Sequence, residues 1–351
     1  MQKAGRGTDD IHDRLYLPTI GITMGDAAGI GPEITLKALS DPNLCKICRP
    51  VVIGDRAFLQ KTAGDLQLSI ELSELGTTPT VSEGQVFVVD LANLPAEIAI
   101  GQESADAGRA AGQYIETAVE LWRQSRIDAI ATAPISKRSL HMGGYDYPGH
   151  TEFLAELTQT ERFAMSFFAE DLRVVLLSTH ISLSDAISRV KTEELVDLIV
   201  FSDKQLSRLL NRKVRLAVAG LNPHASEGGM FGSEEAFEIT PAIERCREQY
   251  GIDVSGPFSP DTIFLRGFRG EFDAVVACYH DQATIAVKSL SFGSSVNVTL
   301  GLPLIRTSVD HGTAFDISGK GIADPSSMKA AIKLAAELAA ASGRVTEAAN
   351  I

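Results

Sequence analysis

The sequence predicts an α/β protein of two domains, with helices on both sides of largely parallel sheets. Short apolar runs rich in β-branched residues alternate with helical stretches along almost the whole chain, as in strand–helix–strand units. The length of 351 residues exceeds the usual size of a single hydrophobic core. A stretch rich in Gly, His and Pro at residues 141–150 marks a crossing between the domains.

The predicted elements follow one another in a regular order. A first strand at 19–24 leads into a helix at 31–39, because Pro32 suits the first turn of a helix. Similar apolar runs predict strands at 51–53, 86–89, 129–132, 173–177, 215–219 and 274–278. Longer stretches with helical periodicity predict helices at 107–123, which is rich in alanine, and at 192–210, 235–249 and 326–342.

Composition excludes several classes of partner. With 32 Lys and Arg against 45 Asp and Glu, the net charge of −13 disfavours nucleic acids and anionic membranes. No apolar run approaches the roughly 18 to 20 residues that span a bilayer. Residues 1–15 include acidic side chains where a signal peptide needs an apolar stretch, so we expect a flexible leader and a cytoplasmic protein. Cys45 and Cys48 form a C-x-x-C pair without the second close pair of a zinc ribbon, which favours a structural role.

A glycine-rich turn, MGDAAGIGPE, follows the first predicted strand. Gly29 and Gly31 would let the backbone approach an anionic ligand at the start of the next helix. A tight strand-to-helix turn without a ligand explains the same residues equally well. The chain contains neither the G-x-G-x-x-G fingerprint nor a Walker A motif.

Three histidines occupy equivalent places in the predicted topology. His180, His224 and His280 each come a few residues after a predicted strand, and the carboxyl ends of parallel strands converge on one crevice. Three imidazoles suit a divalent metal ion and leave coordination positions open for substrate oxygens. Asp281, next to His280, would orient that ring or act as a base. The rival hypothesis is a metal-free site in which one His works with an Asp.

Two further segments indicate ligand binding. Lys288, Asn297 and Arg306 fall within one segment, and Lys and Arg together suit phosphate and carboxylate groups. The glycine-punctuated stretch at 311–325 predicts either a loop that contacts a ligand or a complex surface turn; its candidate contact residues are His311, Gly312, Thr313 and Asp316.

Taken together, these segments resemble the 4-hydroxythreonine-4-phosphate dehydrogenase (PdxA-type) family. The family's markers occur in the family's order between about residues 19 and 342, as GITMGDAAGIGPEI, TAPISK, YPGHTEFLAELT, STHISL, AGLNPHASEGGMFGSEE, SPDTIFL, VACYHDQ and VNVTLGLPLIRTSVDHGTAFDISGKG. The resemblance implies a two-domain, non-Rossmann fold like that of isocitrate and isopropylmalate dehydrogenases. It implies a cofactor-side domain of residues 16–140 plus 300–351, and a domain of residues 141–299 for metal, substrate and dimerisation.

The resemblance also implies roles for individual residues. The metal ligands would be His180, His224 and His280, the third of them contributed by the partner subunit of an obligate homodimer whose two chains share each site. The substrate would be held by His150, Thr151, Lys288, Asn297 and Arg306. The cofactor would contact Gly29, Gly31, His311, Gly312, Thr313 and Asp316. The ion would be zinc, cobalt, magnesium or manganese, one per site.

The implied reaction is the oxidation of the C3 hydroxyl of 4-hydroxy-L-threonine 4-phosphate by NAD or NADP, followed by decarboxylation of the β-keto acid. Asp281 or Asp261 would accept the proton. Ala283 and Thr284 depart from the commoner YHDQG pattern and leave the substrate open, so a 4-phospho-D-erythronate or D-threonate 3-dehydrogenase is the alternative. Outside this reaction class, the alternatives are a non-catalytic metabolite-binding protein of the same fold and a metal-dependent lyase or hydrolase.

Overall fold

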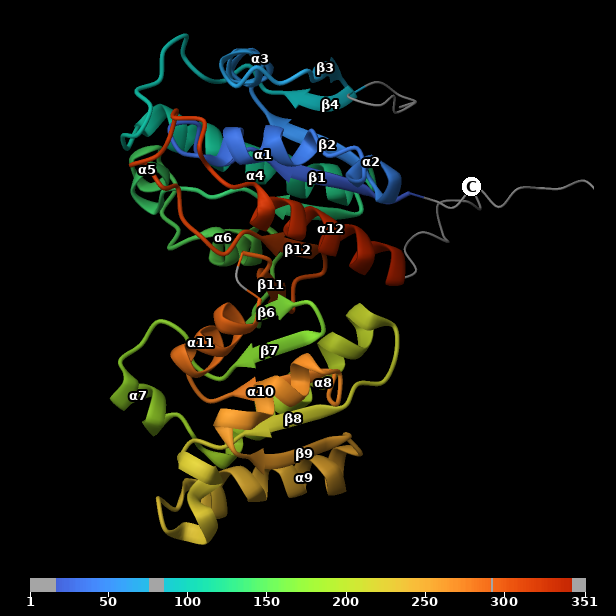
Figure 1. Cartoon of the computed structure of the whole chain (residues 1–351), viewed down its shortest axis with the longest axis vertical. Coiled ribbons are helices and arrows are strands. Elements are labelled where there is room, and N and C mark those ends of the chain that lie inside the picture. The colour runs from blue at the N-terminus through green and yellow to red at the C-terminus, as the bar shows by residue number, and fades with distance from the viewer. Residues whose placement is uncertain (1–16, 76–84, 292, 343–351) are drawn as a thin grey trace, which may run out of the picture.

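The computed structural model describes residues 17–75, 85–291 and 293–342, and the predicted leader lies outside them. Twelve strands in these described residues form one continuous sheet in the order β3-β4-β2-β1-β5-β12-β11-β6-β7-β10-β8-β9. Figure 1 shows this sheet running through the long axis of the molecule, with helices on both sides. The α/β class predicted from the strand–helix alternation is therefore confirmed.

The strands are short and mostly apolar. They are β1 (Thr19–Thr23), β2 (Arg49–Gly54), β3 (Glu71–Glu74), β4 (Gln85–Asp90), β5 (Ala129–Thr132), β6 (Ala164–Ala169), β7 (Leu172–Leu176), β8 (Leu216–Ala219), β9 (Val254–Phe258), β10 (Ala274–Ala277), β11 (Val296–Leu300) and β12 (Ile305–Ser308).

The helices vary in length from single turns to five turns. They are α1 (Gly31–Leu39), α2 (Leu44–Ile47), α3 (Arg56–Asp65), α4 (Ala105–Arg123), α5 (Lys137–Met142), α6 (His150–Leu157), α7 (Leu183–Ser188), α8 (Thr192–Leu210), η1 (Pro223–Gly229), η2 (Glu235–Ile239), α9 (Thr240–Tyr250), α10 (Pro260–Phe268), α11 (His280–Leu290) and α12 (Ser326–Ala341).

The direction of the strands divides the sheet into three parts. Strands β3, β4, β2, β1, β5 and β12 are parallel to one another, and so are β7, β10, β8 and β9. Between these two parallel parts, β11 and β6 pair antiparallel with each other and with their outer neighbours β12 and β7. Because three antiparallel pairings separate β12 from β7, the two parallel parts run in opposite directions, and the segments that follow β5, β12 and β7 line the central pocket described below.

Alternate side chains along β7 show that both faces of this part of the sheet are covered. Val174 and Leu176 pack with α10 and α11 in one apolar cluster, whereas Val175 belongs to the main core on the other side. Adjacent residues of a strand point to opposite faces, so the apolar run of β7 is the pattern of a strand buried on both faces.

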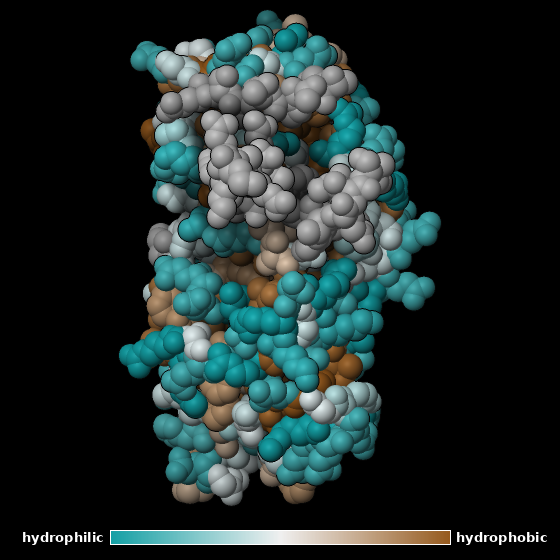
Figure 2. All heavy atoms as spheres, turned by 90° about the vertical axis from the view of Figure 1, so that its right-hand side faces the viewer, coloured by the Kyte–Doolittle hydropathy of each residue, from teal (hydrophilic) through white to brown (hydrophobic). Residues whose placement is uncertain are grey.

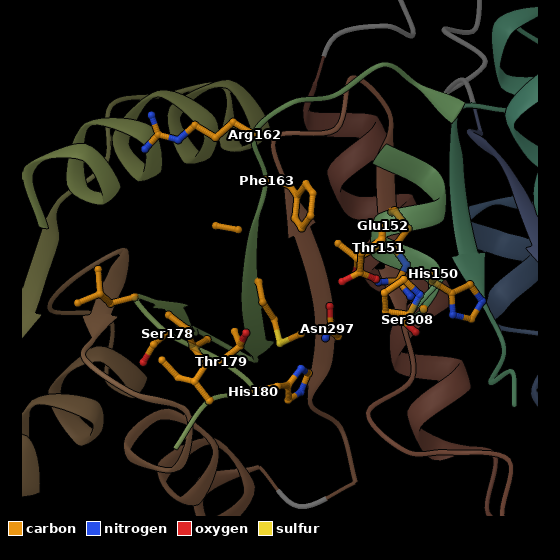
Figure 3. Close-up of a pocket in the computed structure, with 18 of the residues that line it drawn as sticks. His150, Thr151, Glu152, Arg162, Phe163, Ser178, Thr179, His180, Asn297 and Ser308 are labelled. Atoms are coloured by element: carbon orange, nitrogen blue, oxygen red, sulfur yellow. The ribbon is translucent and has the colours of Figure 1, made fainter. Parts of the chain in front are cut away.

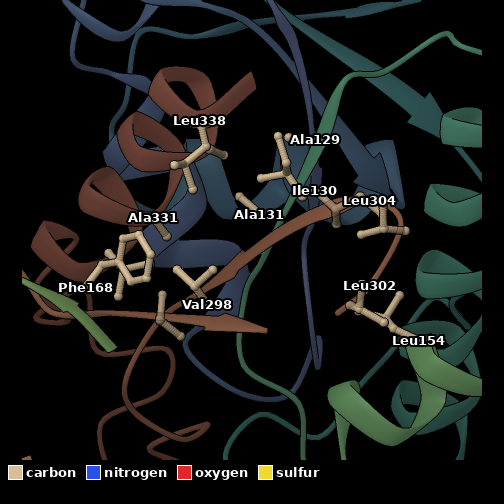
Figure 4. Close-up of a cluster of buried hydrophobic side chains, with 14 of the residues drawn as sticks. Ala129, Ile130, Ala131, Leu154, Phe168, Val298, Leu302, Leu304, Ala331 and Leu338 are labelled. Carbon is tan, nitrogen blue, oxygen red and sulfur yellow. The ribbon is translucent and has the colours of Figure 1, made fainter. Parts of the chain in front are cut away.

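The main hydrophobic core continues across the junction between the parallel parts. Figure 4 shows small and branched side chains of β5 and β11 close to Ala331 and Leu338 of α12, with Leu154 of α6 beside Leu302. Alanines dominate the contact between α12 and β5, which allows the helix to lie close to the strands. This packing fixes the strands that line the pocket described below.

Most predicted elements agree with the structure within one or two residues, but several strands were missed. These are β3, β6, β9, β11 and β12; polar residues interrupt four of them, as in IRTS of β12, whereas β6 (AMSFFA) is apolar apart from one serine. The predicted helix at 235–249 is a π-helical turn, η2, followed by α9. Cys45 lies on α2 and Cys48 caps its end, and burial raises the pKa of Cys48 to about 12, in keeping with a structural thiol.

Polar residues cover much of the described surface on one face of the molecule (Figure 2). The face shown in Figure 2 is covered mainly by hydrophilic residues, with hydrophobic ones in smaller patches between them. Among the described residues, no helix is both long and apolar enough to cross a membrane.

Candidate functional site

A pocket of about 640 Å³ lies at the junction between the two parallel parts of the sheet. Figure 3 shows His150, Thr151, Glu152 and Ser308 on one wall and Ser178, Thr179 and His180 on the opposite one, with Asn297 between them. Because β12, β11 and β7 contribute to it, the pocket depends on the middle of the sheet being assembled.

A buried cation forms the floor of this pocket. Arg306 on β12 is only 3% exposed, and its guanidinium donates hydrogen bonds to the Oγ1 atoms of Thr132 (2.9 and 3.2 Å) and Thr299 (3.1 Å). Burial lowers the pKa of Arg306 to about 10, so the side chain is charged at neutral pH. A buried guanidinium with hydroxyl groups as its only hydrogen-bond partners in the described chain favours an anionic ligand.

Three more polar groups beside Arg306 lack partners or are weakly engaged. His150 Nε2 and Asn297 Oδ1 are buried and have no hydrogen-bond partner among the described residues. Burial, followed by the charge of Arg306, lowers the pKa of His150 well below its usual range, so this ring is neutral. Thr151 Oγ1 lies 3.5 Å from Thr299 Oγ1. Unpaired buried polar atoms around a cavity are the expected state of a binding site without its ligand.

Two of the three predicted metal ligands approach each other within one chain. His180 follows β7, His280 begins α11, and their ring centroids are 5.7 Å apart. The Nδ1 atom of His280 lies 2.7 Å from Asp281 Oδ1, so Asp281 sets the orientation of that ring. His224 packs against Phe231 instead, and no group of three His, Cys, Asp or Glu side chains within the described residues of one chain could hold a metal ion.

His224 lies in an unusual left-handed turn. The φ angles of His224, Ala225, Ser226 and Glu227 are 54°, 51°, 65° and 46°, a region that side chains other than Gly seldom adopt. The carboxylate of Glu235, on the π-helical turn η2, accepts hydrogen bonds from both the backbone N and the Nδ2 of Asn222. Strained backbone held in this way clusters at functional sites.

The glycine turn and the 311–325 loop pack directly against each other. A Cβ atom on Gly29 would lie 2.9 Å from Thr313 Cβ, and one on Gly31 would lie 2.4 Å from the Met24 carbonyl oxygen. The backbone N of Ile30 donates to the Thr313 carbonyl at 3.0 Å. Both glycines therefore allow segments of the same chain to pack closely at the edge of the pocket, where His311 and Gly312 are lining residues.

A buried ion pair fastens the far end of the same loop to α1. Lys37 Nζ donates to Glu33 Oε1 and to the carbonyl oxygens of Gly321 and Ala323 at 2.7 to 2.9 Å. Glu33 also accepts a hydrogen bond from the backbone N of Ala323. The loop is thus held at both ends and presents His311 and Gly312 toward the pocket.

Several predicted site residues lie away from this pocket in one chain. Lys288 on α11 is half exposed, 3.8 Å from Asp310, and does not line the pocket. Asp261, in the first turn of α10, accepts a hydrogen bond from Ser259 and is exposed. Asp316 is exposed on the 311–325 loop.

The structure adds pocket residues that motif reasoning passed over. Ser308 lines the pocket at the end of β12, and Thr132 and Thr299 hold the pocket residue Arg306 through hydrogen bonds from β5 and β11. Lys137 lines the pocket at the start of α5, within TAPISK, and the position of this segment directly after a predicted strand was the available signal. Arg162 and Arg189 also line it, each in an ion pair with a carboxylate.

The fold and the pocket define an α/β protein with a polar pocket, lined by a buried arginine, between the two parallel parts of its sheet. Comparison with known proteins gives the particular family: residues 46–335 match the model of the pyridoxal phosphate biosynthetic protein PdxA, and the chain belongs to that family. The resemblance drawn from the motifs is therefore confirmed.

Similar proteins share nearly the full length of the chain. A D-threonate 4-phosphate dehydrogenase from Cupriavidus necator is 48% identical over 92% of this chain and 98% of its own. A 4-hydroxythreonine-4-phosphate dehydrogenase from Desulforapulum autotrophicum is 45% identical over 93% of this chain and 97% of its own. The crystal structure of a 4-hydroxythreonine-4-phosphate dehydrogenase from Klebsiella pneumoniae has a TM-score of 0.85 at 41% identity, covering 92% of this chain and 99% of that one.

Proposed function

We propose that the chain is an NAD(P)-dependent dehydrogenase that oxidises the C3 hydroxyl of D-threonate 4-phosphate, after which the β-keto acid loses carbon dioxide. The observation that carries this proposal is the buried, charged Arg306 beside the unpaired atoms of His150 and Asn297. These groups suit a small acid with anionic ends. The 48% identical relative named for this substrate supports the choice.

A second candidate substrate is 4-hydroxy-L-threonine 4-phosphate, the compound named for the Desulforapulum autotrophicum relative at 45% identity. It has the same chain length, carboxylate and phosphate, and differs in carrying an amino group at C2. The pocket residues that would hold the two anionic ends serve either molecule.

The donor set supports a divalent metal ion that two subunits hold together. Two imidazoles on one ion, each bound at about 2.0–2.1 Å, have ring centroids roughly 5 Å apart, close to the separation of His180 and His280. We infer that these two bind the ion from one chain and that His224 of the partner subunit completes the site in a homodimer. The strongly exposed Leu183 and Ile285, on α7 and α11, supply apolar surface for such an interface.

The residues of this chain would perform the following roles. Arg306, His150 and Thr151 bind and orient the acid, and Asp281 keeps the His280 ring in position. When bound, the nicotinamide accepts the hydride from C3 and the divalent ion polarises the C3 oxygen. The loop held against Gly29 would form the cofactor side, so residues 16–140 plus 300–351 serve the cofactor and residues 141–299 serve metal, substrate and dimerisation.

A turnover panel tests the proposed reaction. The enzyme, with each of several divalent ions, is mixed with D-threonate 4-phosphate, 4-phospho-D-erythronate or 4-hydroxy-L-threonine 4-phosphate and with NAD or NADP, and absorbance of the reduced nicotinamide is followed. We expect the highest kcat/KM with D-threonate 4-phosphate. Absence of nucleotide reduction with every acid and ion would refute the dehydrogenase, and a higher kcat/KM for the threonine derivative would favour the second candidate.

Subunit mixing tests the shared metal site. If His180 and His280 act from one chain, heterodimers of His180→Ala with His224→Ala keep one complete site and regain activity, whereas heterodimers of His180→Ala with His280→Ala do not. Recovery in the second mixture instead of the first would place His280 on the partner side of the site, which is the arrangement expected if the third histidine in sequence comes from the other chain.

A further inference from the structure

Among the described cationic side chains that line the pocket, Lys137 is the one without an ion-pair or hydrogen-bond partner. Arg162 pairs with Asp197 at 2.6 Å, Arg189 pairs with Glu194 at 2.7 Å, and Arg306 donates to threonine hydroxyls. Lys137, by contrast, has no hydrogen-bond or ion-pair partner within the described part of the chain, although it lines the same pocket.

The side chain of Lys137 lies over the start of helix α6. A Cβ atom built on Gly149, the N-cap of α6, would be 3.7 Å from Lys137 Cε. No side chain caps this helix, so the first backbone N–H groups, those of His150 and Thr151 among them, carry the partial positive charge of the helix end without a side-chain acceptor. The same Cβ would lie 3.4 Å from Glu152 Oε2, so a cation, an uncapped helix N-terminus and the carboxylate of Glu152 meet at one point of the pocket wall.

An independent observation shows that this point is built for a ligand. His150, the first residue of α6, has its Nε2 atom buried without a partner, and Arg306 nearby is a cation at 3% exposure. The two cationic groups differ in chemistry. The planar fork of Arg306 suits a carboxylate, whereas a lysine ammonium together with helix N–H groups suits the three oxygens of a phosphate.

We propose that Lys137 binds the phosphate group of the substrate over the N-terminus of α6, and that this contact sets the preference for phosphorylated acids. The assignment rests on the proposed function, because it takes the substrate to be a 4-phosphorylated acid. It adds a binding residue outside the predicted set of His150, Thr151, Lys288, Asn297 and Arg306.

Selectivity between phosphorylated and unphosphorylated substrates tests the assignment. For Lys137→Met, kcat/KM for D-threonate 4-phosphate should fall about 10- to 100-fold, the loss of one charge-assisted hydrogen bond. The value for unphosphorylated D-threonate and the KM for the nucleotide should stay within about twofold. Lys137→Arg should recover much of the loss, because it keeps the positive charge.

The neighbouring residue gives a matched control. Arg138 has a side chain that is 75% exposed and pairs with Glu103 at 3.1 Å, outside the pocket lining, so Arg138→Met should leave all these constants unchanged. An equal loss with both acids, a change confined to the nucleotide KM, or no change in Lys137→Met would overturn the proposal.

A binding measurement separates this proposal from the reaction itself. If the wild-type enzyme turns over none of the acids, the proposed function fails, and titration calorimetry with inorganic phosphate still tests Lys137. Phosphate binding that weakens at least tenfold in Lys137→Met and is unaffected in Arg138→Met supports the phosphate site. Equal phosphate affinity in the wild type and both variants refutes it.

Discussion

Replacing Arg306 by Met should stabilise the unliganded protein while abolishing its affinity for the acid substrate. Burial lowers the pKa of Arg306 to about 10, and since each pKa unit corresponds to about 1.4 kcal/mol, keeping this side chain charged costs the fold ~3 kcal/mol. Its hydrogen bonds to Thr132 and Thr299 return about 1 kcal/mol for each threonine. The net gain on introducing Met is therefore about 1 kcal/mol.

Urea unfolding without nucleotide, with and without D-threonate 4-phosphate, measures both effects. At 100 times the dissociation constant, the ligand should stabilise the wild type by about 2.7 kcal/mol and Arg306→Met by a negligible amount. Arg212→Met is the matched control, because Arg212 pairs with the buried carboxylate of Asp273 at 2.7 Å and its loss should destabilise the fold. The reasoning fails if Arg306→Met lowers the unfolding free energy by more than 2 kcal/mol, or if the variant keeps the stabilisation by ligand.

Three further predictions concern the rest of the fold. Burial alone would raise the pKa of Asp273, but hydrogen bonds from two arginines lower it to about 2. The contribution of this carboxylate to stability is present above about pH 4 and is lost as the pH falls toward 2. Acid unfolding that begins at a lower pH in Asp273→Asn than in the wild type would contradict this assignment. Gly29→Ala forces a Cβ against Thr313, so the nucleotide KM should rise and the unfolding free energy should drop by about 1–3 kcal/mol, and an unchanged KM would contradict the loop contact. Glu227→Gly, at φ 46°, should leave stability unchanged or raise it by up to about 1 kcal/mol. Glu244→Gly, at an exposed position in the middle of α9, should lower it by about 1 kcal/mol, as thermal unfolding of the two variants would show.

Local sequence patterns predicted the inner parallel strands β1, β2, β5, β7, β8 and β10, because each contains an apolar run that is buried, but they missed the edge strands β3 and β9. The same reasoning missed β11 and β12, whose polar residues are the ones that line the pocket. In β12 the sequence IRTS has four buried positions, and its arginine is buried because Thr132 and Thr299 come from other strands to meet it. No pattern within four residues reports such long-range partners.

The candidate site shows the same limit. Lys288 and Arg306 look equivalent in the sequence, yet one lies exposed on α11 and the other is buried on β12. The convergence of His180 and His280 follows from strand order and was predictable. The separation of His224 from these two histidines within one chain was not predictable, because it depends on a left-handed turn that no pattern in the sequence NPHASEGG indicates.

The antiparallel seam in the sheet has a mechanical consequence. Strands β11 and β12 are joined through only two residue pairs, Asn297 with Ser308 and Val298 with Thr307. Both members of the first pair line the pocket, so a molecule bound there spans the seam and links the two parallel parts across their narrowest hydrogen-bonded connection. Occupancy should therefore slow amide hydrogen exchange along β11 and β12 more than at β3 or β9, the outer edges of the sheet.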